Sequence, residues 1–150
     1  MISLHKIICS CFGIGYIKGG GTIAALACCI IWYSILKDNS NIFITIVATL
    51  LITVIGIWSA GKVETVWGED SSKVVIDEAA GMCVSLLFLP VQLKYIITAL
   101  VLFRFFDIVK PLYIRNLEKL PRGWGVMADD LLSGIYSNLI LQVIVLSNLF

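Results

Sequence analysis

The chain has little charge and almost no histidine. Only 14% of its 150 residues are charged, against about 25% in an average soluble domain, and the formal net charge is +1. It contains no run of lysine or arginine and no basic stripe, which argues against a nucleic-acid partner. His5 is its single histidine and no CxxC pair occurs. A zinc site is therefore not expected.

Apolar residues are in excess. They make up 59% of the chain, the mean hydropathy is +0.99, and a soluble domain has about 45–50%. The length fits one domain covering residues 1–150. The five cysteines stand mostly in apolar surroundings and are expected to be small buried hydrophobes in a reducing compartment. An integral membrane protein is the first interpretation.

Five apolar runs predict helices. They cover residues 23–36, 41–59, 75–89, 94–109 and 128 to the end. The second could continue as far as Trp67 beyond the membrane. The predicted fold is all-α: a compact, integral-membrane helical bundle of about five apolar helices plus shorter ones. A full span needs about 20 residues, and some runs are shorter, so a bundle partly sunk in the membrane is the competing picture.

The basic residues predict an orientation. With five spans, about eight lysines and arginines fall on one side and two on the other. The positive-inside rule then places the N-terminus inside and the C-terminus outside, in a multi-pass arrangement. The glycine-rich loop at residues 13–22 and the acids near the helix ends all fall on the inner side. Separate pieces of chain are thus expected to converge on the cytoplasmic face.

Two pairs of acids are expected to open apolar helices. Asp77 and Glu78 open one, and Asp129 and Asp130 open another. A charge at the centre of a span costs about 2.5–3.5 kcal/mol on insertion scales, so charges at membrane depth usually serve a function. A purely structural explanation is that first-turn acids complement the helix dipole, worth about 0.3–1 kcal/mol. We favour a functional site, because the acids are paired and small or glycine-bearing segments adjoin them.

A third charged group stands at the end of the fourth run. Arg104, Asp107 and Lys110 are spaced i, i+3 and i+6, which would also fit a salt-bridged helical stripe. Four aromatic or aliphatic neighbours of Arg104 argue against free exposure. Hard oxygen ligands without histidine or cysteine select Mg²⁺ or a similar cation, and Arg and Lys bind phosphate oxygens. These residue types fit phosphoryl chemistry on a lipid head group, and equally a cation transporter.

Three blocks of sequence, in order, resemble the phosphatidylglycerophosphatase A family. Residues 75–82 (VIDEAAGM) resemble its aliphatic-Asp-Glu-x-x-Gly-Met motif. Residues 103–111 (FRFFDIVKP), followed by Ile114 and Arg115, resemble FRxxDxxKPxPI. Residues 123–130 (GWGVMADD), followed by Gly134, resemble GxGIMxDDxxAG. The likeness covers about residues 12 to 140.

The chain departs from the family pattern at two places. The family's first loop reads like PGTxGS, whereas residues 20–25 read GGTIAA and lack the proline, the later glycine and the serine. Tyr113 stands where a proline is expected. The acidic and basic residues are intact, so an active enzyme is expected.

The resemblance implies an all-α bundle in the cytoplasmic membrane of a bacterium. It implies Mg²⁺-dependent hydrolysis of phosphatidylglycerophosphate to phosphatidylglycerol and phosphate on the inner leaflet. In our hypothesis, the ligands of Mg²⁺, directly or through water, are Asp77, Glu78, Asp129 and Asp130. One of these four, or Asp107, positions or deprotonates the attacking water, and the phosphoryl group is neutralised by Arg104, Lys110 and Arg115. The Gly19–Thr22 loop, with Gly21 and Thr22, offers backbone N–H groups to phosphate.

Other functions stay open at this point. A divalent-cation transporter would carry acids through the membrane depth, whereas here they cluster at inner ends. A phosphatase for another lipid phosphate monoester would use the same basic residues. A transferase using a nucleotide-activated lipid would show a DGxxAR-type motif, which does not occur. A non-catalytic membrane scaffold would tolerate amide replacement of the acids.

Overall fold

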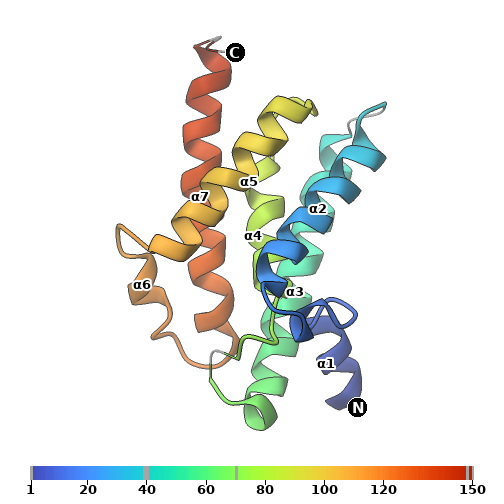
Figure 1. Cartoon of the computed structure of the whole chain (residues 1–150), viewed down its shortest axis with the longest axis vertical. Coiled ribbons are helices and arrows are strands. Elements are labelled where there is room, and N and C mark those ends of the chain that lie inside the picture. Colours follow the sequence, from blue (N-terminus) through green and yellow to red (C-terminus); the bar gives the residue numbers. More distant parts are fainter. Residues whose placement is uncertain (1, 39–40, 70, 148, 150) are drawn as a thin grey trace.

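The computed structural model describes residues 2–38, 41–69, 71–147 and 149, and every regular element in this part is helical (Figure 1). The prediction of an all-α chain is confirmed. The elements are α1 (Ile2–Cys9), a 3₁₀ turn η1 (Ile14–Tyr16), α2 (Gly20–Leu36), α3 (Ile42–Trp67), α4 (Ile76–Leu86), α5 (Leu93–Val109), α6 (Ile114–Leu117) and α7 (Gly123–Leu146).

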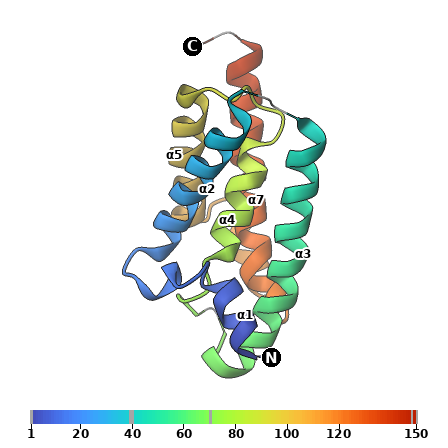
Figure 2. The ribbon, with the colours of Figure 1, turned by 90° about the vertical axis from the view of Figure 1, so that its right-hand side faces the viewer.

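Helix α4 forms the centre of the bundle. It packs against α2, α3, α5 and α7, and Figure 2 shows it between α2 and α3. Nine of its eleven residues are buried. Its sequence allows this, because alanine, glycine and serine give neighbouring helices room to approach.

Two glycines bring α4 and α7 together. A Cβ atom on Gly81 would lie 2.6 Å from the carbonyl oxygen of Asp130, and one on Gly134 would clash with the carbonyl oxygen of Gly81. The backbones of the two helices are therefore in direct contact. This crossing lies about one turn from the acids of both helices, and it sets the distance between them.

Fewer helices are long enough to span a membrane than the five expected. Among the described residues, α3 (26 residues) and α7 (24 residues) are long and apolar enough, by length and composition. Helix α4 has only 11 residues, and α2 and α5 have 17 each. The third run is shorter than predicted because the chain leaves the helix at Leu87, ahead of Pro90. The expectation of five full spans is wrong for these helices.

Two helix boundaries also differ from the expectation. Helix α7 begins at Gly123 and not near residue 128, so Asp129 and Asp130 lie beyond its first turn. Helix α2 begins at Gly20, with Gly19 as its N-cap, and not at residue 23, so Thr22 lies inside the helix. The continuation of α3 to Trp67 is confirmed.

Candidate active site

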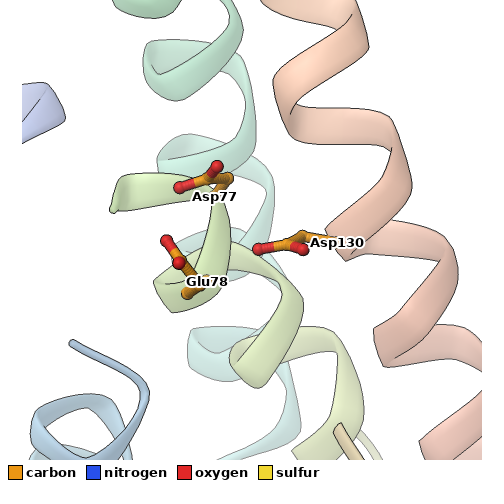
Figure 3. Close-up of side chains that lie close together, drawn as sticks. All are labelled: Asp77, Glu78 and Asp130. Carbon is orange, nitrogen blue, oxygen red and sulfur yellow. The ribbon is translucent and has the colours of Figure 1, made fainter. Parts of the chain in front are cut away.

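Three carboxylates meet where α4 faces α7. Asp77 and Glu78 are the second and third residues of α4, and Asp130 comes from α7. One oxygen from each lies within 4.8 Å of the others, and Figure 3 shows the three side chains close together, with Asp130 extending from α7 toward α4. Asp130 is 3% exposed and Asp77 is 9% exposed. We call these three residues the acidic triad.

One carboxylate oxygen of each triad member lacks a hydrogen-bond partner among the described residues of the protein. Asp77 Oδ1, Glu78 Oε2 and Asp130 Oδ2 are buried and have no hydrogen-bond partner. Helix α4 is capped by Val75, which makes no side-chain capping bond, so Asp77 does not serve as the cap. Clustered, buried carboxylates repel one another and are costly unless paired. Oxygen ligands of this kind suit a hard divalent cation such as Mg²⁺, so the triad fits the metal that the sequence suggested.

Asp129 makes a different interaction from its neighbour Asp130. Successive residues of a helix point in directions about 100° apart, and the Asp129 carboxylate accepts a hydrogen bond of 2.6 Å from Lys110. Lys110 also donates to Glu118 at 2.6 Å. Burial by itself would lower the pKa of Lys110, but the bonds to Asp129 and Glu118 outweigh it and raise that pKa. Asp129 is therefore paired with Lys110 through Oδ2, while its Oδ1 has no hydrogen-bond partner.

Arg104 approaches the triad from the end of α5. Its guanidinium is paired with Asp107 and lies 3.8 Å from Glu78 Oε1. Its side chain is 19% exposed, and its Nε has no hydrogen-bond partner. Asp107 thus orients Arg104, and Arg104 keeps donors for another ligand. An anion placed beside the triad would lie within reach of this group.

The glycine-rich loop packs directly on Glu78. A Cβ atom on Gly21 would clash with Glu78 Oε1, so only glycine permits this approach. Gly21 and Thr22 occupy the first turn of α2, where backbone N–H groups have no intrahelical acceptor. Such a helix N-terminus attracts anions.

A polar cavity of about 570 Å³ lies beside the loop. Residues 15–22 line it together with Ser72, Lys73, Glu78 and Arg104. The cavity thus joins the arginine, one acid of the triad and the N-terminus of α2. Lys18 and Lys73 were not among the site residues expected from the motifs, and they bring two more positive charges to the cavity. Lys73 stands two residues before the VIDEAAGM block, and that position was the available signal.

Arg115 lies outside this arrangement. It is exposed on α6 and makes no ion pair with any described residue. The preceding loop explains one departure from the family motif. Tyr113 has a φ of 68°, whereas a proline ring fixes φ near −65°. A proline would not fit this conformation of the loop.

The fold and the site define a class of arrangement: an all-helical chain in which a carboxylate of the triad, an arginine and the N-terminus of α2 adjoin one polar cavity. The chain belongs to the phosphatidylglycerophosphatase A family, because the sequence model of that family matches residues 7–145. The resemblance seen in the sequence is thereby confirmed, and with it the assignment to the phosphatases.

Relatives support the same family. The chain is 36% identical over 137 residues to phosphatidylglycerophosphatase A of Haemophilus influenzae, covering 89% of this chain and 83% of the relative. It is 30% identical over 127 residues to phosphatidylglycerophosphatase A of Escherichia coli, covering 83% and 73%. It is 42% identical over 147 residues to a Bacteroides thetaiotaomicron protein named "Putative phosphatidylinositol-3-phosphatase", covering 93% and 92%. No solved structure matches the chain.

Proposed function

We propose that the protein hydrolyses the terminal phosphate monoester of phosphatidylglycerophosphate, releasing phosphatidylglycerol and inorganic phosphate. One observation carries the proposal. The acidic triad, with an unpaired buried oxygen on each member, lies beside Arg104 and borders a cavity lined by the first turn of α2. Cation ligands and phosphate-binding groups are thus adjacent, as phosphoryl transfer requires.

Magnesium is the cation that this donor set favours. Asp77, Glu78 and Asp130 would hold it, with Asp129 Oδ1 available through a water molecule. Mg²⁺ binds a few carboxylates and leaves its other positions to water and phosphate oxygens. When bound, it would offset charge on the phosphate and lower the pKa of a water molecule.

Basic groups of the chain would bind the phosphate. Arg104 presents its guanidinium to the cavity, held by Asp107. The N–H groups of Gly21 and Thr22 would donate to phosphate oxygens, because they lie at the N-terminus of α2. Lys110 orients Asp129 through its 2.6 Å bond and adds positive charge. Arg115 would act only if the α6 segment moved toward the cavity.

The reaction needs a nucleophile and a proton donor. In the simplest scheme, a carboxylate of the triad accepts a proton from water while the water oxygen forms a bond to phosphorus. The bond between phosphorus and the glycerol oxygen breaks, and that oxygen takes up a proton from the protonated carboxyl group or from a water molecule. Attack by an aspartate through a phosphorylated intermediate is the alternative route. Either route ends in the lipid alcohol and inorganic phosphate.

The exposed surface supports a membrane location. In the apolar windows of α3 and α7 only 22% and 33% of residues are buried inside the protein. The core helices of soluble proteins are mostly buried, so these windows are better explained by contact with lipid. Helix α1 and the C-terminal end of α7 lie at opposite ends of the bundle (Figure 1). With the lysine and arginine distribution, this supports a bacterial cytoplasmic membrane protein whose active site faces the cytoplasm.

A second substrate has specific support. The relative at 42% identity carries the name of a phosphatidylinositol-3-phosphatase, and a phosphate on inositol is also a monoester on a lipid head group. The cavity has room and positive charge for either head group. Divalent-cation transport has less support, because the family and its named relatives are phosphatases.

The test is phosphate release in detergent micelles. Phosphatidylglycerophosphate and phosphatidylinositol 3-phosphate would be compared with Mg²⁺, with EDTA, and with the Asp129→Asn/Asp130→Asn double variant. We expect release from phosphatidylglycerophosphate that requires both the metal and the aspartates. Faster release from the inositol lipid would transfer the assignment to that substrate. Release from neither lipid by folded protein would refute the proposal, and cation flux in liposomes would then be measured.

A further inference from the structure

An apolar groove of about 440 Å³ lies between α2 and α3, with α4 as its floor. Figure 2 shows the order α2, α4, α3. The lining contains no charged residue and includes Ala27 and Ile31 from α2, Ala48 and Ile52 from α3, and Ile76 and Ala79 from α4. The groove is separate from the polar cavity that holds the phosphate-binding groups.

The groove exists because α2 and α3 do not pack on each other. Each packs on α4, and they make few direct contacts with one another. Small side chains widen the space, since Ala27 and Cys28 face it from α2 and Ala48 faces it from α3. Ile31 remains 58% exposed. An apolar wall of this kind is completed by an apolar ligand.

The groove is lined by residues that adjoin the acidic triad in the sequence. Its floor residues Ile76 and Ala79 flank Asp77 and Glu78 along α4. Ile14 lines the groove and the next residue, Gly15, lines the polar cavity. A single ligand with a charged head and an apolar tail could thus occupy both spaces at once.

The dimensions of the groove select its occupant. It extends along α2 from Ala24 to Leu36, about 18 Å at 1.5 Å per residue. Spread over that length, a volume of 440 Å³ makes a groove that is narrow for its length. An α-helix, about 10–12 Å wide with its side chains, is the bulkier occupant. A hydrocarbon chain fits, because carbon atoms pack at about 3.5–4.0 Å.

We infer that one acyl chain of the lipid substrate lies in this groove while the head group occupies the polar cavity. The inference rests on the function proposed above. It explains how a lipid would present its terminal phosphate to the triad at a fixed depth. It also assigns a recognition role to apolar residues that take no part in the chemistry.

A photolabelling experiment tests the groove directly. The probe is phosphatidylglycerophosphate with a diazirine in one acyl chain, irradiated with the full-length protein in micelles and mapped by mass spectrometry. We expect label on Ile31 and Ile52 in excess of label on exposed apolar residues outside the groove, such as Val101. Unlabelled phosphatidylglycerophosphate should compete for labelling, and phosphatidylcholine should not. Even labelling of all exposed apolar residues would overturn the inference.

Two matched variants on α3 complete the test. Ala48→Trp fills the groove, and we expect it to lower groove labelling and kcat/KM for the lipid about tenfold. Val54→Trp adds the same side chain at a position that is 64% exposed and outside the groove, and should change neither. Equal effects of the two variants would refute the role of the groove. Phosphate release by the parent protein separates the two proposals: release with even labelling refutes only the groove, and groove labelling without release refutes only the reaction.

Discussion

Gly21→Ala should separate the activity of the enzyme from its stability. The added Cβ would lie 2.7 Å from Cδ and 3.2 Å from Cγ of Glu78, whereas carbon atoms pack at about 3.5–4.0 Å. The carboxyl carbon of Glu78 must therefore move by about 1 Å. The backbone accepts alanine, because Gly21 is helical and is not among the glycines with positive φ. The clash falls on the end of a flexible side chain, so the fold can absorb it.

The expected result is a loss of catalysis without a loss of stability. A misplacement of about 1 Å in a catalytic constellation can lower the rate about 100-fold. Alanine is the better helix former by about 1 kcal/mol in a helix interior, so the free energy of unfolding should stay constant or rise. Phosphate release at saturating lipid, repeated over a range of Mg²⁺ concentrations, and urea unfolding of the same preparations would measure the two effects. A higher Mg²⁺ requirement should accompany the slower rate.

Gly61→Ala provides the matched control. This glycine lies within α3, and its added Cβ would meet its nearest atom, the backbone nitrogen of Gly123, at an ordinary 3.4 Å. Its activity should stay within about twofold of the parent, because no triad side chain is near the added atom. Full activity of Gly21→Ala would show that the position of the Glu78 carboxylate does not matter. A parallel fall in stability and activity would show that the glycine serves folding instead.

Three further changes address the rest of the site. Asp130→Asn removes one of three repelling carboxylates, so thermal unfolding in EDTA should occur at a higher temperature while the stabilisation by Mg²⁺ disappears; stabilisation by Mg²⁺ that survives would exclude Asp130 as a ligand. Lys110→Met should lower the free energy of unfolding at pH 7 by about 3 kcal/mol, since it leaves Asp129 unpaired. Because the pKa of Lys110 is raised above its ordinary 10.5, the stabilisation by Lys110 is complete below pH 10.5 and is lost at higher pH. Urea unfolding over a pH series should therefore show the stabilities of the parent and Lys110→Met converging only above pH 10.5. Arg104→Ala should lower kcat about 1000-fold, whereas the kcat of Arg115→Ala should stay within about threefold of the parent. Comparable losses of the two variants in a phosphate-release assay would place Arg115 in the site.

The helices could be predicted from the sequence, and their ends could not. The length of each apolar run indicated a helix whatever its β-branched content. The expected start of α7 near residue 128 was wrong, because glycines such as Gly123 and Gly125 are typical of loops. In the structure, a Cβ on Gly123 would clash with the carbonyl oxygen of Ile57 on α3, so this glycine serves helix packing. Single-sequence patterns do not distinguish a glycine needed for a turn from one needed for contact.

The convergence of the acidic and basic side chains could be predicted from the sequence, but which of them interact with one another could not. The alternation of helices and the lysine and arginine count placed the acids and bases on one side, but the direction of each side chain depends on how α4, α5 and α7 cross. For this reason the sequence did not indicate that Asp130 joins the acidic triad while its neighbour Asp129 binds Lys110. The pairing of Lys110 with Glu118 depends on the turn around residues 110–113, where Lys110 and Tyr113 have positive φ.

The contact of Gly81 with Gly134 has a practical consequence for purification. Helices that associate through close backbone packing do not depend on the hydrophobic effect, which is absent between apolar surfaces in lipid. Detergent tails cannot enter a contact in which even a Cβ atom would clash. Extraction from the membrane should therefore leave the two acid-bearing helices together, and mild and harsh detergents should yield enzyme of similar specific activity until the outer helix α3 detaches.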